Sequence, residues 1–428
     1  MQGKKDAGRA WYFLFVKVLQ QYGFLPNPID HCLFIMKIRD TYAYITLSTD
    51  DNLCSFPTKA DFDAFKTYIK KFFECTFKEG DVLHYLNMRI TQSELGISLD
   101  QTESIMAFLK SYFGTPDTLK HSTIPYSTDS DFEKLLAATI PSTPQELAQL
   151  EVTFKGSYRS LIGSILYFSN GTRIDIMYAL SRLSCYNAAH NPIAFQGIKR
   201  VIRYLAFKKP HVPLFYPRNK LSASNTIMFQ FAPDKQDSFT YTNHLAVHAD
   251  SGMPHDLRDF KSTMCNIFTM LGVSVAPQSK KTASVPTHST DAELRAAHHA
   301  IKRATAFRSL LHSMGVLMPD PITLYQDNDA AKAIMSAGKR PSRTKHIGLL
   351  TTYSQEKHND GSIQTTTEPT SMMLADFGTK PATATLNKRY HYWAAGVRFY
   401  PHKDHPHYNL LRLDWFEKTF LTIISPEK

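Results

Sequence analysis

Cysteine is scarce in this sequence, and its spacing indicates no disulfide framework. Five cysteines are scattered over 428 residues, and no two of them form a CxxC pair. They are Cys32, Cys54, Cys75, Cys185 and Cys265. An odd number without close pairs predicts neither a set of disulfides nor a zinc site. This usage is typical of a reducing compartment, so we expect a cytoplasmic or nuclear protein rather than a secreted one.

Long apolar runs are also missing. The first residues, MQGKKDAGRAWYF, lack the apolar stretch of a secretory signal. No run approaches the roughly 18–20 apolar residues that a bilayer span needs. We therefore expect no membrane partner.

Acidic residues are outnumbered by basic ones. The chain has 49 Lys and Arg against 38 Asp and Glu, a formal net charge of +11. A surplus of this size favours a polyanionic partner, usually nucleic acid, with a general solubility bias as the alternative. Because single cores stop growing near ~250–300 residues, a chain of this length is expected to form two to three domains.

The first half of the chain reads as strands and helices separated by one polar segment. Residues 126–150 are rich in Ser, Thr and Pro and weakly periodic, which predicts a linker or a long surface loop. Helices are predicted over 8–25, 60–75 and much of 156–207, strands over 31–38, 42–48 and 53–56, and a second hairpin over 82–99 with its turn at 93–96.

After a second polar segment, the pattern alternates between strands and helices. The strands are predicted up to residue 250, around 263–277, over 322–326 and near 362–367, and the helices over 289–314, 328–337 and 371–378. Strands followed by helices around a mixed sheet indicate an α/β (α+β) fold class for this part.

Two sets of carboxylates could hold a divalent metal, which prefers hard oxygen ligands. Asp50 and Asp51 are adjacent between two β-rich runs, where their charges repel each other unless a cation lies between them; a plain polar turn is the alternative. The second set is dispersed, and each member taken alone could be a cap, a turn residue or a surface charge. Its members are Asp250 and Asp327 at strand ends, Glu293 in a helix and Asp376 near a later helix.

Two basic segments could contact a phosphate backbone, or could simply be solvated charge. Residues 197–209 form a basic amphipathic helix that includes Lys199, Arg200 and Arg203. A loop further on carries Lys339, Arg340, Arg343 and Lys345.

Several motifs resemble one known family. The segment SYRSLIGSILYFSNGTRIDIMYALSRLS at 157–184 resembles a signature of copia-type retrotransposon Pol polyproteins. Further on, STDAE at 289–293, YQDN at 325–328, RTKHI at 343–347 and LADFGTKP at 374–381 are similar to family motifs and follow in family order. The resemblance runs from residue 9 to about residue 381.

The resemblance implies a truncated reverse transcriptase joined to a ribonuclease H-like mixed-sheet domain. Residues 1–125 would be part of the palm, 126–216 the thumb and connection, 217–240 a linker, 241–385 the ribonuclease H domain and 386–428 a tail. The implied chemistry is DNA synthesis on RNA and hydrolysis of RNA in the hybrid, with Mg²⁺ or Mn²⁺ and no organic cofactor. The implied partners are an RNA–DNA hybrid or other nucleic acid, and other products of the retroelement polyprotein.

For the sites, the resemblance makes Asp50 and Asp51 the polymerase pair. It makes the order strand-Asp, helix-Glu, strand-Asp, helix-Asp the layout of a ribonuclease H site. The metal-binding and catalytic set of that site is then Asp250, Glu293, Asp327 and Asp376.

The chain departs from the family at several points, among them Met373, which stands where the family has a Gln shortly before its last Asp. The polymerase hairpin reads Ser48-Thr49-Asp50-Asp51 and lacks the family's Tyr, and the fingers and early palm strand are absent, so we expect polymerase activity to be lost. His248 stands where the family has its first ligand Asp, so Asp250 would be displaced by ~6–7 Å along the strand and nuclease activity impaired. We expect H248D to raise any such activity. The alternatives are an inactive nucleic-acid-binding remnant, and a piece of a longer polyprotein whose other part restores polymerase activity.

Overall fold

The computed structural model of the chain describes two compact units. One comprises Met1–Ile90 with Thr305–Met318, and the other comprises Thr91–Ala304 with Pro319–Lys428. The described residues are 6–49, 51–93, 96–113, 121–207, 213–217, 245–253, 256, 258–318, 321–336, 346–370 and 373–395.

The first unit is built on an antiparallel sheet in the order β1-β2-β3-β4. Its strands are β1 (Leu25–Pro26), β2 (Leu33–Ile38), β3 (Thr41–Ser48) and β4 (Asp51–Ser55), and its helices are α1 (Ala7–Tyr22) and α2 (Lys59–Ile69). Alternate residues of β3 are buried, namely Ala43, Ile45 and Leu47, and they join Leu19 and Phe65 of the helices in one core. The predicted helices and strands of this region are confirmed, although α2 ends before residue 75.

Two strands follow, β5 (Val82–Tyr85) and β6 (Met88–Gln92), and a third, β7 (Gly96–Asp100), pairs antiparallel with β8 (Leu214–Pro217) in the second unit. Ser93 and Gly96 exchange backbone hydrogen bonds, so the turn predicted at 93–96 is confirmed. The prediction missed β5 as a separate strand.

The second unit begins with a group of helices around a shared core. These are α3 (Thr102–Phe113), α4 (Ser130–Ala138), α5 (Pro144–Thr153), α6 (Tyr158–Asn170), the 3₁₀ turn η2 (Ile174–Ile176), α7 (Met177–Ser184) and α8 (Pro192–Leu205). Tyr158, Ile165, Ala179, Phe195 and Ile202 are fully buried at its centre. The helical prediction for 156–207 is confirmed.

The linker predicted over 126–150 is wrong, because α4 and α5 occupy most of it. Their polar residues are helix caps: Asp129 accepts from the backbone of Asp131, and Thr143 forms a capping box with Glu146. Leu136 of α4 is fully buried. Short capped helices therefore account for the Ser- and Thr-rich composition that resembles a loop.

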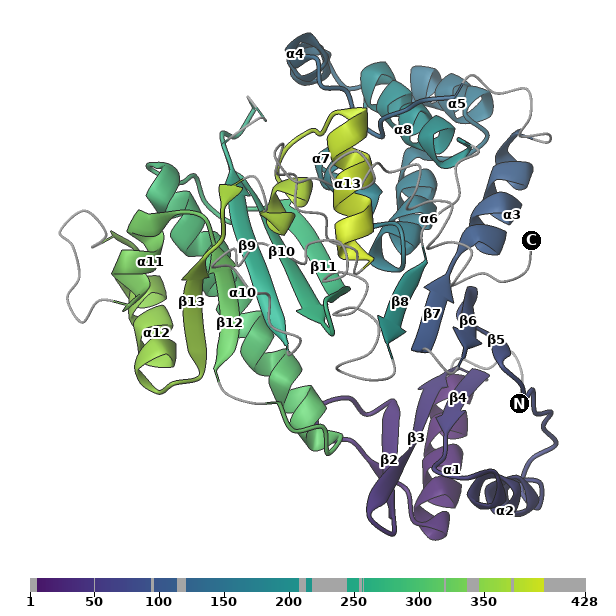
Figure 1. The fold of residues 1–428 in the computed structure, drawn as a ribbon. Helices are drawn as coiled ribbons and strands as arrows, with labels where there is room; N and C mark the ends of the chain where they lie inside the picture. Colours follow the sequence, from purple (N-terminus) through teal and green to yellow (C-terminus); the bar gives the residue numbers. More distant parts are fainter. Residues whose placement is uncertain are drawn as a thin grey trace, which may run out of the picture. The chain divides into compact units, whose positions relative to one another are not determined.

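A mixed five-stranded sheet forms the rest of the unit, in the order β11-β10-β9-β12-β13 (Figure 1). Its strands are β9 (Ala246–Gly252), β10 (Thr263–Met270), β11 (Val273–Lys281), β12 (Ile322–Gln326) and β13 (Ile363–Thr367). β9, β10 and β11 are antiparallel neighbours, whereas β9, β12 and β13 run parallel. The expected mixed sheet of an α/β chain is confirmed.

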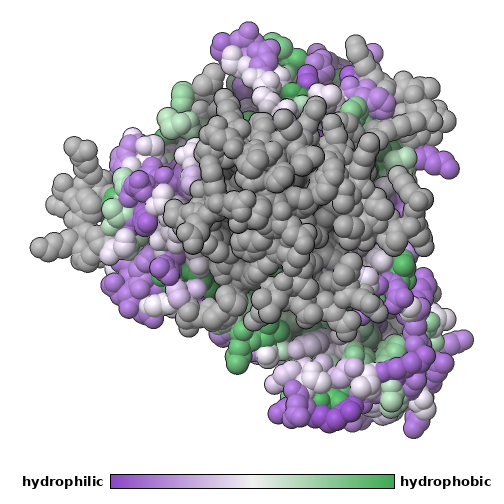
Figure 2. Space-filling view, in the orientation of Figure 1, coloured by the Kyte–Doolittle hydropathy of each residue, from purple (hydrophilic) through white to green (hydrophobic). Residues whose placement is uncertain are grey.

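Helices connect and cover these strands. α10 (Ser289–Ser313) leads from β11 to β12, α11 (Asp329–Ser336) and α12 (Gly348–Asn359) lead from β12 to β13, and the 3₁₀ turn η5 (Leu374–Gly378) and α13 (Ala384–Ala394) follow. The helix predicted over 371–378 is thus a short 3₁₀ turn, and α12 and α13 were not predicted. Figure 2 shows mainly hydrophilic residues over α11 and α12, while Ala331 and Met335 of α11 are buried.

The turn η5 is held firmly between the sheet and the helices. Leu374 and Phe377 pack in one buried cluster with Met177 at the start of α7 and Cys265 of β10. The hydroxyl of Ser279 in β11 donates to the carbonyl of Gly378 at 2.5 Å. These contacts fix the backbone around Asp376 over the sheet. In the part of the chain that the structure describes, no helix is both long and apolar enough to cross a bilayer.

Candidate metal centre

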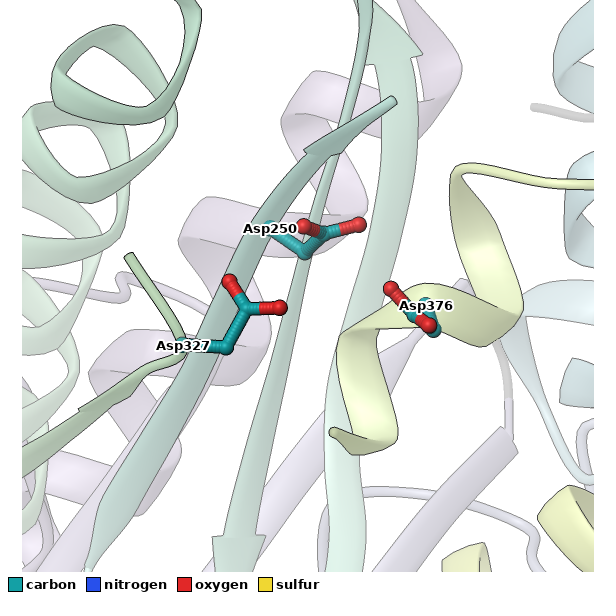
Figure 3. A group of neighbouring side chains, drawn as sticks. All are labelled: Asp250, Asp327 and Asp376. Carbon is teal, nitrogen blue, oxygen red and sulfur yellow. The ribbon is translucent and has the colours of Figure 1, made fainter. Parts of the chain in front are cut away.

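Three aspartates that are far apart in the sequence meet near the carboxyl ends of the inner strands β9 and β12 of the mixed sheet (Figure 3). Asp250 comes from β9, Asp327 directly follows β12, and Asp376 lies in η5. One carboxylate oxygen from each lies within 4.8 Å of the others. A group of hard oxygen donors at this spacing could hold a metal ion.

The strand register explains why two of the three lie together. The parallel pairing of β9 and β12 sets Tyr325 opposite His248. Two residues further along each strand, on the same face, come Asp327 and Asp250. Any register shifted by one residue would turn one of these carboxylates to the other face.

The third carboxylate is brought in by the segment after η5. The hydroxyl of Thr379 donates a hydrogen bond to Oδ2 of Asp250, and the backbone N–H of Thr379 donates to the carbonyl of Asp376. Thr379 is fully buried, so it links η5 to β9 in a setting without competing water. Asp376 is thereby held over the end of β9.

Glu293, in the second turn of α10, lies beside this group. Its carboxylate accepts a hydrogen bond from Nε2 of Gln326 at 2.7 Å, and both side chains are buried. Gln326 directly precedes Asp327, so the side chain of Gln326 points to the other face of the sheet, toward Glu293 of α10. Glu293 does not belong to the set of three residues whose oxygens lie within 4.8 Å of one another.

The crowding of negative charge disfavours ionisation of these acids. Burial, followed by the charge of Asp250, raises the pKa of Asp376 to about 7. The same two causes raise the pKa of Asp327, and they raise the pKa of Glu293 well above its usual value. A cation placed among these groups would reverse the effect, because it stabilises the ionised form of each of them.

Comparison with known proteins gives this geometry a context. No protein-family profile matches the chain. The retrovirus-related Pol polyprotein from transposon RE1 of Arabidopsis thaliana is 26% identical over 388 residues, which cover 90% of this chain and 24% of that protein. The corresponding polyprotein from transposon RE2 of the same plant is 27% identical over 387 residues, covering 89% of this chain and 23% of that protein. The chain is a distant homologue of copia-type retrotransposon Pol polyproteins.

The homology extends over most of this chain but over a small part of its relatives. The chain spans about a quarter of the length of the RE1 and RE2 Pol polyproteins. Among solved structures, the prototype foamy virus protease–reverse transcriptase is similar with a TM-score of 0.23 and 8% identity, over 93% of this chain and 63% of that one.

His248, at the position where the Pol resemblance expects a ligand, is engaged elsewhere. Its Nδ1 lies 2.8 Å from Oε2 of Glu368, and both side chains are fully buried. Its ring stacks on Tyr325 with a centroid separation of 4.7 Å. Asp250 itself lies in the group of three, so the displacement expected from the sequence does not keep it away from Asp327 and Asp376.

The other candidate residues of this Pol homologue lie apart from the group or outside the described residues. Asp51 is exposed at the start of β4 in the first unit, and within the described ranges it belongs to no group of three or more possible metal ligands. Five candidate residues fall outside the described residues, namely Asp50, Lys339, Arg340, Arg343 and Lys345. The same holds for residues 218–240 of the predicted linker and for residues 396–428 of the tail.

The basic residues of α8 line an open hollow of about 540 Å³. Lys199, Arg200 and Arg203 share its wall with His121 and Ser122. Lys199 also lies over the ring of Phe154, 5.5 Å from its centroid. Positive charge is thus gathered on a concave surface rather than spread along an exposed helix.

Sequence reasoning missed four residues around the aspartate group and His248: Gln326, Glu368, Thr379 and Lys380. Three of them stand inside or next to the quoted motifs, in YQDN and LADFGTKP. Their position beside a candidate carboxylate in these motifs could have identified them as site residues. Glu368 had none, because only the folded sheet brings it to His248.

Proposed function

We propose that this chain carries a ribonuclease H centre that hydrolyses the RNA strand of an RNA–DNA hybrid with Mg²⁺ or Mn²⁺. The observation that supports it most is the convergence of Asp250, Asp327 and Asp376 in a homologue of copia-type Pol. In this proposal residues 241–385 are the ribonuclease H domain, residues 126–216 the thumb and connection, and residues 1–125 part of a palm.

The donor set fits a hard divalent cation. All three aspartates offer carboxylate oxygens, the ligand type that Mg²⁺ prefers, and Glu293 lies close enough to interact with two of them. A metal held there would stabilise the negative charge that develops on a phosphodiester during hydrolysis. Thr379 would orient the carboxylate of Asp250, and Gln326 that of Glu293.

The hollow along α8 supports a polyanionic substrate. We assign Lys199, Arg200 and Arg203 to contacts with phosphates of the nucleic acid, and we keep Lys339, Arg340, Arg343 and Lys345 as further candidates from the sequence. Contacts of this kind position the duplex without reading its sequence. Discrimination between the hybrid and other duplexes would then depend on the metal centre and on the groove shape of the nucleic acid.

Polymerase activity is not part of the proposal for this chain. Asp50 and Asp51 remain the predicted polymerase pair, but the hairpin that carries them lacks the Tyr found in the family. Without that ring, positioning of a primer end should be weak.

The direct test is cleavage of a labelled RNA–DNA hybrid by the purified chain with Mg²⁺ or Mn²⁺. We expect wild type to cleave the RNA strand, D376N to lose cleavage, and D360N to keep it. Asp360 is a matched control because it is also an aspartate paired with a lysine, Lys357, at 2.7 Å.

The alternative function is binding of nucleic acid without turnover. Binding of the hybrid that weakens steeply with salt, together with no difference between wild type and D376N in the cleavage assay, would establish it. Absence of binding at low salt would rule out both functions.

A further inference from the structure

A lysine pairs with one member of the aspartate group. Nζ of Lys380 donates to Oδ1 of Asp376 at 2.6 Å. The Lys380 side chain is 45% exposed, whereas that of Asp376 is 12% exposed. The ammonium thus lies on the solvent side of the Asp376 carboxylate.

The ammonium interacts with the whole group rather than with one partner. The carboxylate of Asp376 that binds the ammonium has an oxygen within 4.8 Å of oxygens of Asp250 and Asp327. The charge of the ammonium therefore acts on all three carboxylates. A single lysine therefore offsets part of the repulsion among three aspartates.

The backbone next to Lys380 is held by hydrogen bonds, while the lysine side chain is partly exposed. Gly378 is held by Ser279, and Thr379 is held by Asp250. The residue before them, Phe377, is buried in the cluster with Met177. A lysine side chain is a flexible four-carbon stem, and that of Lys380 is partly exposed to solvent. Rotation about its side-chain bonds can therefore move the ammonium from Asp376 into solvent without any change of the backbone.

We propose that the ammonium of Lys380 is the resident counter-ion of the aspartate group, and that a divalent metal ion binds there by displacing it. The inference rests on the metal centre of the proposed function. A metal ion and an ammonium that share the same carboxylates repel each other, so binding of one opposes the other. Lys380 then sets the metal concentration at which the centre fills.

The test is calorimetric titration with Mn²⁺ alone, at pH 8, on wild type and K380M. Removing the competing charge should tighten Mn²⁺ binding on the order of tenfold. K380R keeps the charge and should bind Mn²⁺ as wild type does. K357M removes a lysine of α12 that is paired with Asp360, and it should also bind Mn²⁺ as wild type does. Circular dichroism confirms that each variant folds, and K380Q replaces K380M if the latter does not.

Two results would overturn the inference, and they differ in what they say about the metal centre. Equal or weaker Mn²⁺ affinity in K380M would show that Lys380 does not compete, and would leave the proposed function standing. Absence of Mn²⁺ binding by wild type and by K380M would remove both the inference and the proposed centre.

A second readout is thermal stability, which needs no titration. Without metal, K380M should unfold at a lower temperature than wild type at pH 8, because its carboxylates have lost their counter-ion. Saturating Mn²⁺ should then raise the melting temperature of K380M more than that of wild type. An equal rise in the two proteins would contradict the displacement.

Discussion

In the proposed centre, the side chain of Asp376 would couple metal binding to protons. Its pKa is raised to about 7 by burial and by Asp250. Near neutral pH, this carboxyl in the metal-free protein is therefore shared between a protonated and an ionised form. Metal binding requires the ionised form, so protons and metal compete for the same oxygen atoms.

This competition predicts a pH-dependent stabilisation by metal. An acid whose pKa is raised on folding keeps its proton where the unfolded chain, with a pKa of about 4, has lost it. The metal-free protein should therefore lose stability as pH rises from about 4 to about 7. The increase in melting temperature caused by Mn²⁺ should be larger at pH 8 than at pH 5.5, as thermal melts in EDTA and in Mn²⁺ would measure. Equal increments at the two pH values would contradict the prediction.

His248 gives a second prediction at the residue scale, and it differs from the one drawn from the sequence. Replacing His248 by Asp would place a carboxylate against Glu368, in a position where both side chains are fully buried. We expect H248D to lower the free energy of unfolding by about 3 kcal/mol, because it places a second buried carboxyl group against that of Glu368. Chemical denaturation measures this value.

The double variant H248D/E368Q separates charge repulsion from loss of packing. Removing the charge of Glu368 should recover a large part of the lost stability. If the double variant were as unstable as H248D, loss of the stacking between His248 and Tyr325 would be the cause instead.

At the scale of elements, the proposed metal centre depends on how closely the segment of η5 and Thr379 approaches β9. A Cβ added to Gly252 would lie 2.5 Å from the carbonyl oxygen of Thr379 and 3.2 Å from its carbonyl carbon. These are backbone atoms, so one of the two segments would have to move. The hydrogen bond from Thr379 to Asp250 lies in the same contact.

G252A should therefore weaken Mn²⁺ binding and lower the free energy of unfolding by about 1–3 kcal/mol. Titration and chemical denaturation measure the two effects. G163A is the matched control: Gly163 is exposed in α6, a Cβ there meets no atom within 4 Å, and alanine favours the helix. Unchanged metal affinity in G252A would show that this approach does not position the carboxylates.

At the scale of the whole molecule, the positive net charge is expected to act through particular surfaces. We predict that the triple variant K199Q/R200Q/R203Q binds an RNA–DNA hybrid more weakly and with less sensitivity to salt. Loss of three phosphate contacts should reduce the slope of log affinity against log salt by about 2–3. The slope is measured by fluorescence anisotropy at KCl concentrations from about 50 to about 300 mM.

A control distinguishes this surface from general charge. K357M, K66Q and R39Q together remove three positive charges that are already paired with acidic neighbours. This variant should keep the wild-type slope. If both triple variants changed the slope equally, the net charge rather than the hollow along α8 would account for binding.

Much of the fold could be predicted because periodicity and caps are local. The helices at 7–22 and 289–313 and the strands at 33–38, 41–48 and 322–326 follow directly from the spacing of apolar residues. The helices α4 and α5 were missed because their caps have the composition of a loop, and α4 depends on distant partners. Arg182 of α7 pairs with Glu133 of α4 at 2.9 Å, and the arginine is almost fully buried.

The sequence by itself determined the Pol homology, the mixed sheet and the residue types of the candidate centre. These depend on motifs and local patterns, which survive without coordinates. Only the tertiary structure decided which carboxylates lie close together, that His248 pairs with Glu368, and that Lys380 pairs with Asp376 beside the other two aspartates. The physical reason is that electrostatic coupling depends on distances of a few ångströms, and those distances arise when strand register and the packing of η5 bring residues more than a hundred positions apart into contact.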